Sequence, residues 1–245
     1  MDIEGVDIEG VDIEGVDIEG VEGRECRRRW MEESETQDWS NGKTTSLYLM
    51  RHGECEGGDI LRGQTDVALS QLGKEQMQQE LAGLDIEFEQ VICSPLRRCS
   101  EFALSLYLEK GIPLKMEDGL KEIDFGDWDG ETLETLFQQS SSVLDMYWKN
   151  PWAFTPPNGE TMQEFEARVN QGWERIISQY SGQTLLLVTH GGVIRHLMSK
   201  ALGATGVAGF YTQLALDYAC VVKITVYSSA QGELFTKLHW GANGN

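Results

Sequence analysis

Two short apolar runs in this chain are each followed by the same dipeptide, His-Gly. The run at 47–50 precedes Arg51-His52-Gly53, and the run at 185–188 precedes Thr189-His190-Gly191. Ligands of open α/β sheets bind beyond the carboxyl ends of the strands, and glycine lets the backbone approach a ligand closely. Because the chain has only four histidines, the repeat favours one shared crevice over two unrelated strand-end histidines.

The hydrophobic pattern alternates between strand and helix from about residue 44. It predicts strands at 46–51, 91–93, 184–189, 220–227 and 233–239, an extended segment at 112–114, and helices at 71–84, 95–109, 161–180 and 192–201. Ser70 is a candidate cap of the first helix, and Ser94-Pro95 is expected to open the second. This alternation predicts an α/β three-layer sandwich with a mostly parallel central sheet.

The segment 120–160 contains several glycines and prolines. The residues concerned are Gly126, Gly130, Pro151, Pro156 and Pro157. Since these residues break helices and strands, the segment is predicted to be irregular.

Composition excludes several classes of protein. The formal net charge of −20 over 245 residues argues against nucleic acid or an anionic membrane as partner. There is no apolar run long enough to span a membrane and no secretory signal at the start. The five cysteines form no CxxC pair, which predicts free thiols and a cytoplasmic location.

The first twenty residues are an acidic repeat, Met-Asp-Ile-Glu-Gly followed by three copies of Val-Asp-Ile-Glu-Gly. A glycine in every unit and repelling carboxylates oppose regular structure. We therefore divide the chain into a disordered tail, 1–43, and a folded domain, 44–245. The repeat is either an interaction tail or a duplicated stretch without a role, carried in by an early start codon. Met31 is an alternative start.

The residues beside the first histidine suit phosphoryl transfer. Imidazole can accept a phosphoryl group and form a covalent intermediate, and planar arginines bind the charge on its oxygens. Arg51 adjoins His52, and Arg97 and Arg98 follow the second predicted strand at a helix start, where backbone N–H groups also favour anions. One of these last two arginines is expected to face solvent.

A run at 120–130 mixes acids, aromatic residues and glycines, and supplies a candidate proton donor for a leaving oxygen. Its acids Asp124, Asp127 and Asp129 do not match the spacing of a calcium-binding loop. We expect neither a metal nor a cofactor.

Four motifs in order resemble the histidine phosphatase superfamily, in its phosphoglycerate mutase-like branch. They are R-H-G, S-P-L-x-R, L-x-E-x-x-F-G-x-W-x-G and T-H-G-G-V-I-R, within about 46–228. Further segments look most like the bacterial α-ribazole phosphatases of cobalamin synthesis: Arg62-Gly63-Gln64-Thr65-Asp66, E-I-D-F-G-D-W-D-G and Pro157-Asn158-Gly159-Glu160-Thr161.

The resemblance implies a role for each matching residue. His52 is the nucleophile, Glu122 protonates the leaving oxygen and later activates water, and His190 stabilises the transferring group. Arg51 and Arg98 bind phosphate, Arg98 because it holds the last position of S-P-L-x-R.

Other candidates are less closely tied to the motifs. Arg62, near a position that is often polar, is a possible third phosphate clamp, and Gly191 is a candidate for close backbone contact with substrate. Cys55 beside the nucleophile is either a redox-sensitive or an inert thiol.

The implied function is hydrolysis of a small phosphate monoester through a phosphohistidine, with α-ribazole 5′-phosphate as preferred substrate. Alternatives are a broad-specificity phosphatase, a phosphoglycerate mutase, a phosphoprotein phosphatase, and a non-catalytic phosphate-binding module. A cluster of Met146, Tyr147, Trp148, Trp152 and Phe154 is either a cap over the site, suited to an aromatic leaving group, or ordinary packing.

Overall fold

Six strands form one sheet in the computed structural model, which describes residues 42–239. They are β1 (Lys43–Arg51), β2 (Gln90–Cys93), β3 (Leu114–Met116), β4 (Thr184–Thr189), β5 (Val221–Ser228) and β6 (Leu234–His239). Their order across the sheet is β3-β2-β4-β1-β5-β6. β5 pairs antiparallel with β1 and β6, whereas the other pairs are parallel. The prediction of a mostly parallel sheet is confirmed.

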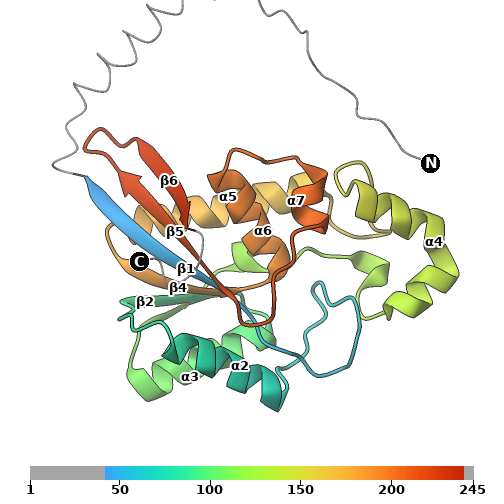
Figure 1. Cartoon of the computed structure of the whole chain (residues 1–245), viewed down its shortest axis with the longest axis horizontal. Helices are drawn as coiled ribbons and strands as arrows, with labels where there is room; N and C mark the ends of the chain where they lie inside the picture. The colour runs from blue at the N-terminus through green and yellow to red at the C-terminus, as the bar shows by residue number, and fades with distance from the viewer. Residues whose placement is uncertain (1–41, 240–245) are drawn as a thin grey trace, which may run out of the picture. The chain divides into compact units, whose positions relative to one another are not determined.

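Helices cover both faces of this sheet, with α2 and α3 on one face and α5 and α6 on the other (Figure 1). The helices are α2 (Gln71–Ala82), α3 (Arg97–Lys110), α4 (Leu133–Lys149), α5 (Met162–Gln179), α6 (Gly191–Ala201) and α7 (Ala208–Thr212), with 3-10 turns η2 (Asp118–Leu120) and η3 (Gly126–Trp128). This is the expected three-layer α/β sandwich.

The apolar runs of β1 and β4 are continuous because both faces of the central strands are buried. Side chains alternate between the faces of a strand, so Leu47 and Leu49 join one core cluster while Tyr48 and Met50 join the other. The two cores lie under opposite helix layers and hold the carboxyl ends of both strands in place.

Side-chain capping starts two of the helices, at the predicted cap Ser70 and at Thr161, for which no cap was predicted. Ser70 accepts a hydrogen bond from the Gly73 N–H and begins α2. Thr161 and Glu164 form a reciprocal capping box at the start of α5. These bonds satisfy N–H groups that have no partner inside the helix.

The expected opening of α3 at Ser94-Pro95 is wrong. The helix begins at Arg97, and its N-cap residue Leu96 makes no side-chain capping bond. The Ser94 hydroxyl accepts from the Leu96 N–H at 3.3 Å and bonds the ring of His190 at 2.7 Å. The serine therefore serves a tight turn and the site instead of the helix end.

The segment 120–160 is not irregular throughout, because it contains the 17-residue helix α4. Thr132 caps this helix by accepting from the Thr135 N–H at 3.1 Å. Gly130 and Pro151 lie just outside its ends. We misread these residues as breakers of the whole segment, although they only bound the helix. The short helix α7 was also not predicted.

The predicted disordered tail lies outside the described residues, apart from its last two positions, 42 and 43. Within residues 42–239, none of the helices combines the length and the apolar composition needed to cross a membrane.

Candidate active site

The two His-Gly dipeptides lie next to each other at one edge of the sheet. β1 and β4 pair in parallel with Arg51 opposite Thr189, and the His52 N–H donates to the Thr189 carbonyl at 3.0 Å. The rings of His52 and His190 meet edge to face with centroids 5.3 Å apart. The two imidazoles are therefore neighbours, as predicted, but only His52 lines the cavity, so the expected crevice shared by both rings is not what forms.

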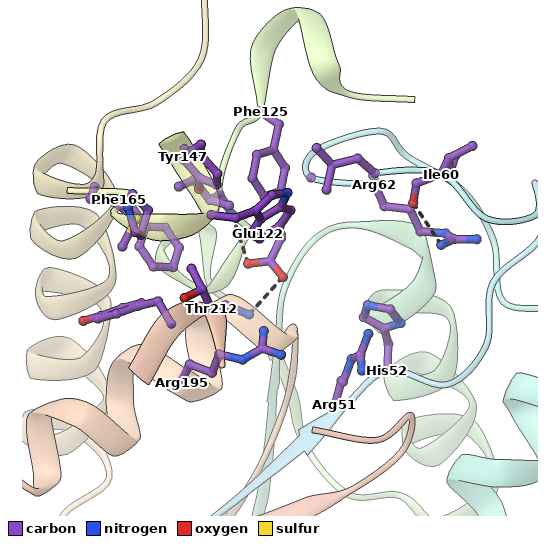
Figure 2. A pocket seen from close by; sticks show the side chains of 18 of the residues that line it. Arg51, His52, Ile60, Arg62, Glu122, Phe125, Tyr147, Phe165, Arg195 and Thr212 are labelled. Atoms are coloured by element: carbon purple, nitrogen blue, oxygen red, sulfur yellow. Dashed lines mark hydrogen bonds between the residues drawn. The ribbon is translucent and has the colours of Figure 1, made fainter. Parts of the chain in front are cut away.

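A cavity of about 280 Å³ opens beside His52. Figure 2 shows His52 and the Glu122 carboxylate on facing sides of it, with Arg51 and Arg195 below them. Its polar walls are formed by Arg51, His52, Asp59, Arg62, Arg98, Glu122, Arg195, Thr212 and Tyr218. The dense positive charge is what an anionic ligand requires.

His52 is neutral and has one ring nitrogen held by the backbone. Its Nδ1 lies 2.8 Å from the Gly53 carbonyl oxygen, which only accepts, so Nδ1 carries the proton. Burial, reinforced by the positive charge of Arg98, lowers the pKa of His52 to about 3. Nε2 therefore keeps a free lone pair at neutral pH. Cys55 Sγ lies 3.5 Å from Nδ1, and burial raises the pKa of this thiol, which disfavours the reactive thiolate.

His190 is fully buried behind this cavity and does not line it. Its Nδ1 accepts from Arg98 Nε at 3.2 Å, and its Nε2 bonds the Ser94 hydroxyl at 2.7 Å. Burial, together with the charge of Arg98, lowers its pKa well below the usual value. His190 is thus a neutral ring whose nitrogens both have protein partners.

Arg98 has no exposed surface, and each of its nitrogen atoms donates to the protein. Nε donates to His190, Nη1 to the Thr65 carbonyl at 2.8 Å, and Nη2 to the Gly63 carbonyl at 2.5 Å. The neighbouring Arg97 side chain is half exposed and pairs with Glu101 at 2.7 Å. The sequence pattern thus selected the arginine of the pair that reaches the cavity.

Arg51 and Arg62 approach the cavity from opposite sides. The Cζ atom of Arg51 lies 4.4 Å from the centre of the Tyr218 ring, and Nη1 donates to the Leu216 carbonyl. Arg62 donates through Nη1 to the Ile60 carbonyl at 3.4 Å, and through Nη2 to other carbonyls of its own loop. Arg62 lines the cavity, but its hydrogen bonds hold the loop that carries it.

Glu122 presents its carboxylate to the cavity while accepting two backbone hydrogen bonds. Oε1 accepts from the Ile123 N–H at 3.1 Å and Oε2 from the Gly192 N–H at 3.0 Å. The loop behind it is fixed by Arg168, which donates to the carbonyls of Gly119, Lys121 and Glu122 and pairs with Glu160 at 2.8 Å. These bonds set the direction of the carboxylate.

Several cavity residues were missed by the sequence reasoning, among them Gly192, Arg195, Asp59, Thr212 and Tyr218. Gly192, and not Gly191, lines the wall, and a Cβ there would lie 2.2 Å from Glu122 Oε1. Arg195 also lines it, one helical turn after Gly191. The i, i+4 spacing from the His-Gly dipeptide was the available signal, since such residues share a helix face.

The cavity also has an apolar lining, half of whose residues are aromatic. It is lined by Ile60, Leu61, Ile123, Phe125, Tyr147, Trp148, Pro151, Met162, Phe165 and Tyr211. Within the cluster predicted from sequence, Tyr147 and Trp148 of α4 reach this wall, whereas Trp152 packs on Tyr211 at 5.6 Å and Phe154 lies against the core. Part of that cluster therefore covers the cavity and part is ordinary packing.

The acids of the 120–130 run are engaged with the protein itself. Asp124 accepts from the Gly126 N–H, Asp127 from the Asn158 amide and Asp129 from the Gln64 N–H. Within residues 42–239, His, Cys, Asp and Glu side chains form no cluster suited to a metal ion.

Comparisons with known proteins agree with this geometry. The family model of the histidine phosphatase superfamily (branch 1) matches residues 47–236. A bifunctional protein of Mycobacterium tuberculosis is 32% identical over 184 residues, which are 74% of this chain and 50% of that protein. The chain thus spans about half the length of that relative.

Two further relatives have alpha-ribazole phosphatase in their names. The adenosylcobalamin/alpha-ribazole phosphatase of Escherichia coli is 29% identical over 178 residues, 71% of this chain and 86% of that protein. The alpha-ribazole phosphatase structure from Shigella flexneri superposes with a TM-score of 0.68 at 26% identity, covering 82% of this chain and 98% of that one. The family model matches most of the chain, and the two neighbouring histidines at the carboxyl ends of β1 and β4 agree with it. This chain therefore belongs to branch 1 of the histidine phosphatase superfamily.

Proposed function

We propose that the chain hydrolyses phosphate monoesters through a phosphohistidine formed on His52. The observation that carries this proposal is the neutral imidazole, with Nδ1–H bound to the Gly53 carbonyl and Nε2 left free beside the cavity. A pKa of about 3 keeps this lone pair unprotonated across the physiological range.

In the first step, His52 Nε2 attacks the phosphorus atom and the bond from phosphorus to the ester oxygen breaks. Glu122, as a carboxylic acid on the facing wall, gives its proton to the departing oxygen. The products are a neutral alcohol, a phosphohistidine and the Glu122 carboxylate. The Gly53 carbonyl stabilises the Nδ1–H of the ring as Nε2 becomes bonded to phosphorus.

In the second step, a water molecule attacks the phosphorus atom from the side that the alcohol has left. The Glu122 carboxylate takes one proton from this water, and the phosphorus–Nε2 bond breaks. Inorganic phosphate leaves, and His52 and Glu122 regain their starting protonation states. The Gly192 and Ile123 N–H groups hold the carboxylate in position for both steps.

The arginines around His52 serve to bind the charge of the transferring group. This charge spreads over three oxygens, and preorganised donors in a site shielded from water stabilise it strongly. Arg51 and Arg98 both line the cavity, and Arg98 is already oriented by its bonds to backbone carbonyls. His190 then acts mainly by holding Arg98 through their shared hydrogen bond.

The preferred substrate that we propose is α-ribazole 5′-phosphate. Two relatives whose names include this activity cover most of the domain. The aromatic side chains in the cavity lining, among them Phe125, Tyr147 and Trp148, suit a planar aromatic leaving group. A cavity lined by both arginines and aromatic side chains fits a phosphate ester of that kind better than it fits a small polar phosphoglycerate.

The test is phosphate release from α-ribazole 5′-phosphate, p-nitrophenyl phosphate and 3-phosphoglycerate by the full chain and by His52→Ala. We expect preference for the ribazole ester, with activity lost in the variant while its circular dichroism is unchanged. Acid-labile phosphate trapped on the wild-type chain, and absent from His52→Ala, would identify the intermediate.

His239→Ala is the matched control, because it removes a histidine on β6 that does not line the cavity. It should keep full activity. A fully active His52→Ala chain would refute the mechanism. Equal slow turnover of all three esters would leave the chemistry intact and refute the substrate, and a requirement for a bisphosphate would indicate a mutase.

A further inference from the structure

The hydrogen-bond donors of the cavity arginines are not equally occupied. Each nitrogen of Arg98 already donates to the protein. Arg62 directs both of its Nη atoms at carbonyls of its own loop. Arg195 instead uses only Nε, which donates to the Leu214 carbonyl at 2.8 Å. Its Nη1 and Nη2 form no hydrogen bond with residues 42–239, although the side chain lines the cavity.

Arg51 also has an unpaired hydrogen-bond donor. Its Nε is buried without a hydrogen-bond partner among the described residues. A buried donor without a partner is unfavourable, so an acceptor that binds in the cavity would be stabilised by this N–H group. Arg62 also has a buried Nε without a partner, but its two Nη atoms are occupied, so Arg195 is the cavity arginine that has both Nη atoms unpaired among the described residues.

One short segment holds Arg51 and Arg195 side by side. Arg195 binds the Leu214 carbonyl and Arg51 binds the Leu216 carbonyl, two residues further along the chain. The side chain of Arg51 is also covered by Tyr218 of the same segment. The guanidinium groups are therefore positioned before any ligand binds.

Gly191 lies between the two guanidinium groups. A Cβ on this residue would lie 3.1 Å from Arg195 Nη1 and 3.5 Å from Arg51 Nε. The missing side chain lets two positive groups approach the same point. Burial lowers the pKa of Arg195; the charge of Glu122 opposes this shift, and the nearby charge of Arg51 adds to it.

We propose that Arg195 is a substrate-binding residue, and that its Nη atoms donate with Arg51 to the oxygens of the phosphoryl group. The inference rests on the proposed function for the identity of the anion. Arg195, on helix α6, would then bind the phosphoryl group from the side of Glu122, in addition to Arg51 and Arg98. The anion would satisfy the buried Arg51 Nε and relieve the repulsion between the two guanidinium groups.

The experiment is calorimetric titration of the full chain with inorganic phosphate and with orthovanadate, without any turnover. We expect Arg195→Met to weaken binding about 10- to 100-fold, as loss of charge-assisted hydrogen bonds does. Arg195→Lys should be intermediate, because lysine keeps the charge but not the two-pronged geometry.

Arg97→Met is the matched control, since it removes the same charge from an exposed side chain outside the cavity. It should leave phosphate affinity unchanged. Arg195→Ala tests a purely structural role, because millimolar guanidinium should restore phosphate binding if the missing group is the anion's partner. The melting temperatures of the variants show separately whether loss of the hydrogen bond from Arg195 to the Leu214 carbonyl destabilises the fold.

Three results would overturn the inference: a wild-type chain that binds no phosphate, an Arg195→Met chain that binds it as tightly as wild type, and an affinity loss that guanidinium does not rescue. The last would mean that Arg195 acts only through the Leu214 segment. A chain that binds phosphate through Arg195 and yet hydrolyses no ester would refute the proposed function while leaving this inference intact.

Discussion

At the residue scale, the buried histidines link the site to the stability of the fold. His52 and His196 have pKa values of about 3 and about 4, both lowered chiefly by burial, and the pKa of His190 is lowered as well. All three would bind a proton near pH 6.5 once the chain unfolds. The unfolded state therefore takes up more protons as the solution becomes acidic.

We predict that the free energy of unfolding falls as the pH drops from 6.5 towards 4. Above pH 6.5 the stabilising contribution of the neutral rings is fully present, because both states are then uncharged at these positions. Below pH 6.5, each buried histidine lowers the free energy of unfolding by up to about 1.4 kcal/mol per pH unit. Urea unfolding between about pH 8 and pH 5 measures this slope.

A single substitution separates the histidine contribution from that of the carboxylates. His52→Ala should show a shallower pH dependence than wild type, because one titrating ring has been removed. An identical slope in both chains would contradict the assignment of a depressed pKa to His52.

At the element scale, helix α2 packs its backbone directly on the nucleophile segment. A Cβ on Gly73, in the first turn of α2, would lie 2.0 Å from the Glu54 carbonyl oxygen. A Cβ on Gly53 would lie 2.1 Å from the Gly73 carbonyl oxygen. Both glycines are needed because a helix and a loop meet here without side chains between them.

We predict that Gly73→Ala destabilises the chain by at least about 2 kcal/mol, because backbone atoms on both sides must move. Gly83→Ala at the other end of α2 is the control. A Cβ there has its nearest neighbour at 3.4 Å and its φ of −75° suits alanine. Denaturant unfolding should therefore find Gly83→Ala close to wild type, and equal losses for both variants would sink the packing argument.

Helix α4 and helix α3 show where local patterns mislead at this scale. Gly130 and Pro151 read as breakers of the segment between them, yet a helix forms there because its Leu136, Leu144 and Tyr147 pack into the core. Ser94 reads as a helix cap, yet its hydroxyl bonds a histidine 96 positions away. Neither outcome is encoded within a window of ten residues.

At the scale of the whole molecule, the acidic chain must admit an anionic ligand. Residues 1–30 hold 10 of the 40 acidic residues and 4 of the 20 basic ones. Charges further than about 8 Å from the substrate are screened at physiological salt. The arginines that line the cavity act at contact distance, so they dominate the potential that the substrate meets.

We predict that a chain beginning at Met31 retains the turnover number of the full chain at physiological salt. Every cavity residue lies between 51 and 218, and the first strand begins at Lys43. Parallel assays of both chains on p-nitrophenyl phosphate provide the measurement. A clear loss of turnover in the shorter chain would assign a function to the acidic repeat.

The sequence alone determined the features that depend on short-range order. The apolar runs before His52 and His190 predicted neighbouring strands, strand–helix alternation predicted a mostly parallel sheet, and the pattern S-P-L-x-R selected Arg98 over Arg97. The strands and the sheet could be predicted because side-chain periodicity, and the approach that a glycine allows, are properties of a few consecutive residues. The choice of Arg98 came instead from the resemblance to a family motif.

Only the tertiary structure decided how the side chains of the site share their hydrogen bonds. It put His190 behind the cavity, turned the Nη donors of Arg62 to its own loop, and left the Nη donors of Arg195 without a partner among residues 42–239. The physical reason is that several of these donors are paired with carbonyls that come from distant parts of the chain, as Arg195 Nε is with Leu214 and Arg98 Nη2 with Gly63. Which carbonyl lies within reach depends on how distant segments pack, and no local pattern records that.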